Sequence, residues 1–284
     1  MQKLPLAQLE TIANDIREDI IKMLEHAGSG HSAGPLGLAD IFTALYFDVM
    51  KYDPKNPTWD ERDIILLSNG HCVPVQYASM AHAGFFDKKE LMTLRQLGTR
   101  LQGHPERTKL PGLENTSGPL GCGLSQACGM ALAMRMDKQS HRWVYVVMGD
   151  GEQDEGNVWE AAMLASKYKL NNIIAITDRN NIQIDGPTES VMPLEDFKAK
   201  WEAFGWHVLE INGNDIEAVI DACAMAKAIV EKPIMIVAHT VPGKGVDFME
   251  YDFHYHGMLL HPEDAKKALH ELRTLGGKIR GEHE

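Results

Sequence analysis

Cysteine is scarce in this chain, and its four copies follow no metal-binding or disulfide pattern. Cys72, Cys122, Cys128 and Cys223 include no CxxC pair. Structural zinc sites and small disulfide-rich folds show regularly spaced cysteines, so neither class is expected. Free thiols in a reducing, cytoplasmic compartment are the expected state.

Long apolar runs and an excess of positive charge are also missing. No stretch approaches the roughly 20 apolar residues of a membrane-spanning helix, and the N-terminus lacks the hydrophobic region of a signal peptide. Lysine and arginine total 28 against 40 aspartates and glutamates, which gives a net charge of −12. This balance disfavours binding to nucleic acid or to anionic membranes. The 44% of hydrophobic residues is typical of a globular protein with a full core.

Strand-like and helix-like segments alternate along the chain. Short apolar runs predict buried strands at 63–68, 142–148, 173–177, 206–211 and 233–239. Apolar residues at helical spacing predict helices at 4–27, 38–50, 75–83, 90–97, 124–136, 157–170, 195–204 and 215–230. The glycine-rich stretch 28–37 is predicted to be a loop. We therefore expect one α/β domain over 1–284, with a mainly parallel sheet, helices on both faces and a charged helical tail at about 262–284.

The most informative stretch joins a strand, a glycine turn and a helix. Residues 149–157 read GDGEQDEGN and directly follow the strand expected at 142–148. Asn180 lies just beyond the next expected strand. The crossover rule makes the two strands parallel, so Asp150 and Asn180 are expected at the same carboxyl edge of the sheet. Ligands bind at that edge in open α/β sheets.

A carboxylate and a carboxamide at this edge suit a magnesium ion that carries phosphate. With one backbone carbonyl, their hard oxygens supply half of an octahedron and leave positions for water and two phosphate oxygens. Gly149 and Gly151 let the backbone approach a phosphate, and the following helix start offers free N–H groups. Gly-Asp-Gly alone is more often an ordinary acidic turn. Its pairing with Asn180, after 28 intervening residues, favours a diphosphate site.

This pairing resembles the diphosphate motif of thiamine diphosphate enzymes. Its continuation, DRNNIQIDGPT from residue 178, is similar to transketolase in particular. The resemblance implies thiamine diphosphate and Mg²⁺ as cofactors. It also implies that the metal is bound by Asp150, Asn180 and the carbonyl of Ile182.

Four histidines in loops add to the expected site. His31, His71, His104 and His256 are flanked by glycine or proline in predicted loops rather than on apolar faces. A lone loop histidine usually faces solvent, but several in similar turns favour a shared polar cleft. A histidine can hold a phosphate or a sugar hydroxyl and can move a proton near neutral pH.

The loops around these histidines resemble transketolase as well. The resemblance implies that His71 reaches the cofactor phosphates. It implies catalytic roles at the reacting sugar for His31, His104 and His256. The last loop also contains His254, and the sequence leaves both of its histidines open, although the match favours His256.

Further matches complete the expected cofactor site. The remaining residues that the resemblance implies are Gly118, Pro119, Leu120, Gly149, Gly151 and Glu155. The first three resemble a turn whose backbone lies along the thiamine. Glu155 matches a glutamate that joins paired active sites across a subunit interface.

The resemblance runs from the first helix to His256 and corresponds to the diphosphate-binding domain of transketolase. In that family a pyrimidine-binding domain supplies the glutamate that activates the thiamine. We therefore expect the N-terminal subunit of a split transketolase, which moves a two-carbon ketol unit from a ketose phosphate to an aldose phosphate. Its expected partner is a C-terminal subunit with the pyrimidine and C-terminal domains, most simply in an α₂β₂ assembly.

Two other interpretations stay open at this point. One is the α subunit of a 2-oxo acid dehydrogenase E1, or a split ketol transferase for an unusual sugar. The other is a non-catalytic assembly subunit that keeps the fold only for packing, which the intact Asp150, Asn180 and loop histidines disfavour.

Overall fold

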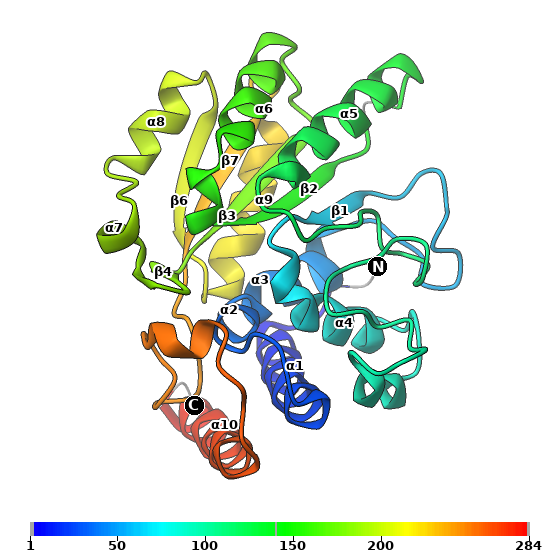
Figure 1. Cartoon of the computed structure of the whole chain (residues 1–284). Helices are drawn as coiled ribbons and strands as arrows, with labels where there is room; N and C mark the ends of the chain where they lie inside the picture. The colour runs from blue at the N-terminus through cyan, green and yellow to red at the C-terminus, as the bar shows by residue number, and fades with distance from the viewer. Residues whose placement is uncertain (1–2, 140, 283–284) are drawn as a thin grey trace.

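Five parallel strands form the centre of the chain, in the order β1-β2-β3-β7-β6 (Figure 1). The computed structural model describes residues 3–139 and 141–282. The strands of this sheet are β1 (Ile64–Leu67), β2 (Val144–Gly149), β3 (Ile173–Arg179), β6 (His207–Asn212) and β7 (Ile234–His239). A two-stranded antiparallel ribbon follows β3 and consists of β4 (Ile182–Gln183) and β5 (Gly186–Pro187).

Side chains of the central strands alternate between two hydrophobic cores. Along β3, Ile174 and Ile176 belong to one core, whereas Ile173 and Ala175 belong to the other. Both faces are therefore covered, as the near-continuous apolar runs of the strands require. The predicted fold class, a mainly parallel sheet with helices on both faces, is confirmed.

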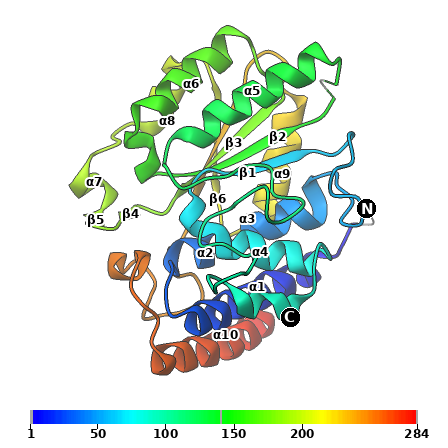
Figure 2. The ribbon, with the colours of Figure 1, turned by 45° about the vertical axis from the view of Figure 1, so that its right-hand side comes forward.

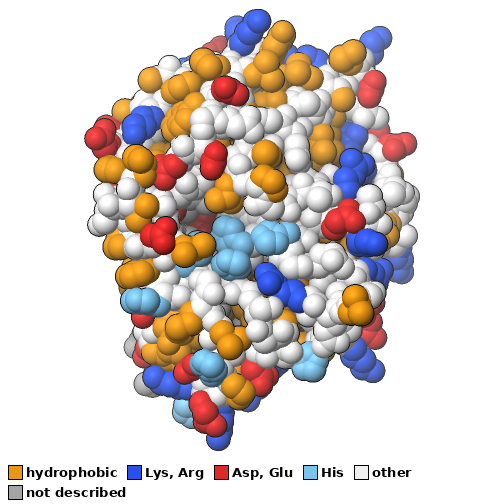
Figure 3. All heavy atoms as spheres, viewed as in Figure 1, with side chains coloured by type: hydrophobic (Ala, Val, Ile, Leu, Met, Phe, Trp, Pro, Cys, Tyr) orange, Lys and Arg blue, Asp and Glu red, His pale blue; other side chains and the backbone are white. Residues whose placement is uncertain are grey.

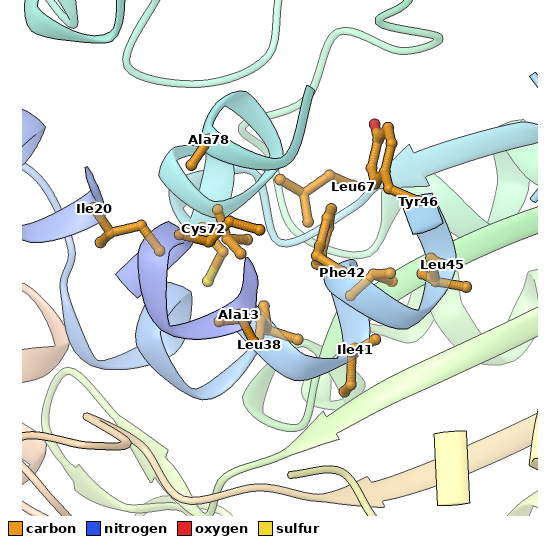
Figure 4. Close-up of a cluster of buried hydrophobic side chains, with 14 of the residues drawn as sticks. Ala13, Ile20, Leu38, Ile41, Phe42, Leu45, Tyr46, Leu67, Cys72 and Ala78 are labelled. Atoms are coloured by element: carbon orange, nitrogen blue, oxygen red, sulfur yellow. The ribbon is translucent and has the colours of Figure 1, made fainter. Parts of the chain in front are cut away.

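Each core has its own set of helices (Figure 1). The first core contains α1 (Leu6–Ala27), α3 (Ala39–Ala44), α4 (Val73–His82) and α9 (Ile216–Ala228). The second contains α5 (Cys122–Met136), α6 (Gly156–Lys167) and α8 (Phe197–Ala203). Figure 4 shows part of the first core, where side chains from α1, α3, α4 and β1 pack together. The tail helix α10 (Pro262–Glu282) lies along α1 (Figure 2), and residues 283–284 of the expected tail are outside the described part.

The prediction of a loop over 28–37 is wrong in its second half. Residues Ala33–Gly37 form α2, and all of them are buried. A Cβ at Gly34 would lie 2.7 Å from Cys72 Sγ, so this glycine allows close packing rather than flexibility. Arg17 of α1 holds the far end of the segment, because its Nε donates to Leu36 O at 3.1 Å.

The helix predicted over 90–97 is also wrong in part. A 3₁₀ helix covers only Lys88–Thr93. Arg95 has a φ of 60°, a left-handed conformation that stops a helix. Leu97, which suggested a continuing apolar stripe, is fully exposed.

The packing of β3 leads to a stability prediction. Ile174→Ala should lower the free energy of unfolding by about 3 kcal/mol, because it leaves a cavity at a completely buried position of the first core. Val230→Ala, at a position that is 70% exposed, should change it by less than about 0.5 kcal/mol. Chemical denaturation of both variants measures the difference, and equal losses would contradict the assignment of the core.

Candidate active site

The carboxyl ends of β1, β2 and β3 open into one cleft of about 360 Å³. Figure 3 shows histidine side chains gathered at a hollow in the middle of this face. The cleft is lined by most of the residues singled out in the sequence: His31, His71, His104, His256, Gly118, Leu120, Gly149, Asp150, Gly151, Asn180 and Ile182. The expectation that Asp150 and Asn180 meet at one sheet edge is therefore met by the geometry. It follows from the parallel pairing of β2 and β3, which sets Gly149 opposite Asp178.

Pro119 and Glu155 are not among the residues that line this cleft. Glu155 is exposed, and its side chain lies next to the turn that precedes α5. Gly121 in that turn has a φ of +83°, and a Cβ there would lie 2.7 Å from Glu155 Cβ. An exposed carboxylate beside the cleft is accessible to another chain, so the interface role of Glu155 stays a prediction.

The carboxylate of Asp150 is almost completely buried at the end of β2. Its Oδ2 accepts from Arg179 Nη1 at 3.0 Å and from the backbone N of Asn181 at 2.7 Å. Its Oδ1 accepts from the backbone N of Gly151 at 2.7 Å. Burial raises the pKa of Asp150, whereas the Arg179 guanidinium and these backbone donors oppose the rise.

Asn180 is oriented by a second buried carboxylate. Its Nδ2 donates to Asp178 Oδ2 at 2.8 Å, and its Oδ1 accepts from the backbone N of Ile182 at 3.1 Å. Thr240 at the end of β7 donates to the other oxygen of Asp178. Burial, together with the negative charge of Asp150, raises the pKa of Asp178 to about 7. Asp178 thus ties the carboxyl ends of β3 and β7 together beneath Asn180.

Three of the four histidines form a triangle of rings. The centroids of His31 and His71 are 4.9 Å apart, those of His71 and His256 are 5.0 Å apart, and those of His31 and His256 are 5.6 Å apart. The Nδ1 atoms of His31 and His256 are buried and have no hydrogen-bond partner among the described residues. Each of these atoms therefore keeps an unused capacity for one hydrogen bond.

Burial keeps the histidine cluster neutral. It lowers the pKa of His31 to about 4, and the neighbouring His256, Arg95 and His104 add to the effect. Burial also lowers the pKa of His71, His104 and His256. At neutral pH each ring accordingly carries one N–H donor and one acceptor nitrogen.

The structure separates the two histidines of the last loop. His256 ends a short 3₁₀ helix, Phe253–His256, and lines the cleft. His254 is exposed, its Nδ1 lies 2.6 Å from Asp252 Oδ1, and its ring stacks on Phe253. His256 is therefore the histidine that faces the site.

Several cleft residues were not singled out in the sequence. Glu152 lines the cleft, is almost fully buried, and its carboxylate accepts from Ser68 Oγ and from the backbone N of Gly121 and Gly149. Asn69 also lines the cleft, and its Oδ1 is buried without a partner in the described part of the chain. The motifs GDGE and SNGH are apparent in the sequence. They lie far apart along the chain, however, so the sequence does not show that their side chains are in contact.

Comparison with known proteins decides the family. The model for "Transketolase, thiamine diphosphate binding domain" matches residues 9–275. The chain belongs to this transketolase family. It is 43% identical over 268 residues to the 6-deoxy-6-sulfo-D-fructose transketolase subunit SqwG of Clostridium sp. strain MSTE9, covering 94% of this chain and 97% of that one. It is 40% identical over 275 residues to an apulose-4-phosphate transketolase subunit of Phocaeicola vulgatus, covering 97% of both.

Longer transketolases match over part of their length. Human transketolase is 37% identical over 268 residues, which cover 94% of this chain and 42% of the human one. The Pichia stipitis transketolase solved in complex with sedoheptulose 7-phosphate has a TM-score of 0.89 at 34% identity, covering 95% of this chain and 41% of that one. The transketolase from Campylobacter jejuni gives a TM-score of 0.88 at 37% identity, with coverage of 95% and 43%. The chain thus spans about two fifths of the solved transketolases that it matches.

These findings confirm the interpretation as an N-terminal transketolase subunit of the split type, within a family of transferases. They favour it over the α subunit of a 2-oxo acid dehydrogenase E1. The matched family model describes a domain that binds thiamine diphosphate. No helix in the described part of the chain is long and apolar enough to cross a membrane.

The low pKa of His31 generates a prediction about the folded chain. Between pH 6.5 and about 4 the unfolded chain binds a proton at His31 that the folded chain does not bind, so stability falls as the pH falls through this range. His31→Gln should therefore lose less stability than wild type between pH 7 and pH 4.5. His104→Gln should behave in the same direction, since its pKa is lowered as well. Denaturation at both pH values measures the effect, and identical losses in wild type and His31→Gln would contradict it.

Proposed function

We propose that this chain is the diphosphate-binding subunit of a split transketolase, which transfers a two-carbon ketol unit from a ketose phosphate to an aldose phosphate. The observation that carries the proposal is the cleft itself. Its lining includes Asp150, Asn180 and Ile182 together with four histidines. The relatives that match over their full length are named as transketolase subunits, which supports the same reaction class.

The lining residues fit a magnesium-bound diphosphate. Asp150 Oδ1, Asn180 Oδ1 and the Ile182 carbonyl would be the metal ligands, all of them hard oxygens. The backbone of Gly149 and Gly151 would lie against the diphosphate, and His71 would contact its phosphates. Gly118, Pro119 and Leu120 would lie along the thiamine. The buried, unpartnered Oδ1 of Asn69 supports a polar ligand here, because leaving such an atom unpaired costs about 1–3 kcal/mol.

Bound thiamine diphosphate supplies the carbon nucleophile for cleaving and forming the carbon–carbon bond. The chain's own contribution is to hold the sugar and to move protons. Neutral His31, His104 and His256 can each accept a proton from a sugar hydroxyl or donate a hydrogen bond to it. The unpartnered Nδ1 atoms of His31 and His256 offer such contacts without breaking an existing hydrogen bond.

The charge of the cleft points to shared recognition of the sugar. None of the described residues that line the cleft is a lysine or an arginine. Arg95 stands beside it, where its guanidinium contacts Gly103 O at 3.4 Å and Ser29 Oγ at 3.5 Å. A sugar phosphate would thus meet one cation from this chain, and a C-terminal subunit would supply the others.

The proposed partner carries the pyrimidine and C-terminal domains and contributes the glutamate that activates the thiamine. The relatives that match over 97% of their own length are named as transketolase subunits, which supports this division. An α₂β₂ assembly is the simplest closed arrangement, and Glu155 would lie at its subunit boundary. A reducing, cytoplasmic setting is supported by the four free cysteines. A split enzyme for an unusual sugar is a specific form of the same proposal, since one relative is named for a sulfonated fructose.

The metal assignment predicts the behaviour of two variants. Asp150→Ala and Asn180→Ala should each abolish magnesium-dependent retention of thiamine diphosphate, because each loses an oxygen ligand. Equilibrium dialysis of the assembled enzyme with and without Mg²⁺ measures retention, and circular dichroism checks the fold. Asn214→Ala, which removes partly buried hydrogen bonds to Gly37 O and Val241 N away from the cleft, is the control for general damage. Retention equal to wild type in both ligand variants would remove the metal assignment.

Reconstitution tests the proposed function as a whole. The purified chain with thiamine diphosphate and Mg²⁺ should show no ketol transfer, because the activating glutamate is assigned to the other subunit. Adding a pyrimidine-domain subunit should produce activity together with an α₂β₂ mass. The measurements are a ketol-transfer assay over several ketose donors and native mass determination. Full activity from this chain alone would overturn the division between subunits.

A further inference from the structure

Arg179 is next to both side chains proposed as metal ligands: next to Asn180 in the sequence and next to Asp150 in the folded chain. It directly precedes Asn180, but it is not among the residues that line the cleft. Its side chain contacts Asp150 outside the cleft lining, and Nη1 donates to Asp150 Oδ2 at 3.0 Å. Its other terminal nitrogen, Nη2, donates to Glu189 Oε1. One guanidinium therefore bridges a buried carboxylate and a carboxylate at the surface.

The two carboxylate oxygens of Asp150 accept different numbers of hydrogen bonds. Oδ2 accepts from Arg179, from the backbone N of Asn181 at 2.7 Å and from Thr188 Oγ1 at 3.3 Å. Within the described residues, Oδ1 accepts only from the backbone N of Gly151. A carboxylate oxygen has two lone pairs, so Oδ1 keeps acceptor capacity while Oδ2 is saturated. This asymmetry selects the oxygen that is free to bind a cation.

Arg179 is itself held in place on the side away from the cleft. Its side chain is 10% exposed and its guanidinium lies 5.9 Å from the centre of the Phe197 ring. Glu189, its second partner, also accepts from the backbone N of Leu194 and Glu195, each at 3.3 Å. The planar fork of arginine suits such a two-sided contact, which a lysine ammonium cannot reproduce.

We propose that Arg179, anchored by Glu189, is a positioning residue that fixes the Asp150 carboxylate with Oδ1 free for the metal. This inference rests on the proposed function, since it takes Asp150 as a metal ligand. Arg179 does not line the cleft, so it would act on the metal site through its contact with Asp150. Residues that orient metal ligands in this way typically change metal affinity by 10- to 100-fold when they are replaced.

A different role for Arg179 makes the opposite prediction. If Arg179 only neutralised Asp150, it would compete with Mg²⁺ for the carboxylate, and its removal would lower the magnesium requirement. If it positions the carboxylate, its removal raises that requirement. The direction of the change therefore separates the two roles.

The test uses the enzyme assembled with its C-terminal partner. Thiamine diphosphate retained in equilibrium dialysis is followed while Mg²⁺ is titrated, and kcat is measured separately at saturating Mg²⁺ and cofactor. Arg179→Met should raise the Mg²⁺ concentration for half-maximal retention by about tenfold, with kcat close to wild type. Arg179→Lys should recover only part of the loss. Glu189→Gln, at a half-exposed side chain, should raise the requirement in the same direction but by less than Arg179→Met.

Two controls make the result decisive. Arg135→Met removes an exposed arginine of α5 that donates to the carbonyls of Tyr168 and Lys169, and it should leave the magnesium requirement unchanged. An unchanged or lowered requirement in Arg179→Met overturns the inference, and if that variant does not fold, an unchanged requirement in Glu189→Gln does so. Asp150→Ala distinguishes the two levels of the argument. Normal retention in Asp150→Ala overturns the metal assignment itself, whereas loss there with no effect at Arg179 overturns only the positioning role.

Discussion

The hydrogen bonds around the buried Asp150 carboxylate join the parts of the chain on which the cleft depends. They link the end of β2 to the turn after β3 through the backbone N of Asn181, and to α7 (Thr188–Val191) through Thr188. A carboxylate buried without such donors would be costly, because removing a charge from water is unfavourable. Arg179 and the backbone donors offset this cost. The same contacts that stabilise the buried negative charge also set the orientation of the carboxylate.

A similar principle applies to the other buried carboxylates at this edge. Asp178 joins Asn180 to Thr240 across β3 and β7. Glu152 joins the loop after β1 to the turn before α5, through Ser68 and Gly121. Three acidic side chains thus fasten neighbouring strand ends to one another beneath the cleft. The floor of the cleft is consequently polar and cross-linked by hydrogen bonds.

The histidine cluster of the cleft is governed by burial rather than by hydrogen bonds. The rings of His31, His71 and His256 are packed closely, and burial lowers the pKa of each. Mutual repulsion between charged rings lowers the pKa of His31 and His71 further, so the cluster is neutral at neutral pH. Neutral rings keep both a donor and an acceptor nitrogen. The described residues that line the cleft include no lysine or arginine, as the proposed sharing of the site with another chain expects.

The strand–turn–helix pattern around Asp150, the apolar strand runs and the four loop histidines could all be identified in the sequence, because local patterns determine local structure and parallel crossovers have one hand. That reasoning brought Asp150 and Asn180 to one edge and indicated a shared cleft. Tertiary contacts decided the rest. Residues 33–37 form a buried helix, and the helix expected at 90–97 is shorter than predicted. His256, and not His254, lines the cleft. Tertiary contacts also joined Arg179 to Glu189 and Glu152 to Ser68, since contacts between side chains on different elements depend on packing that no local pattern encodes.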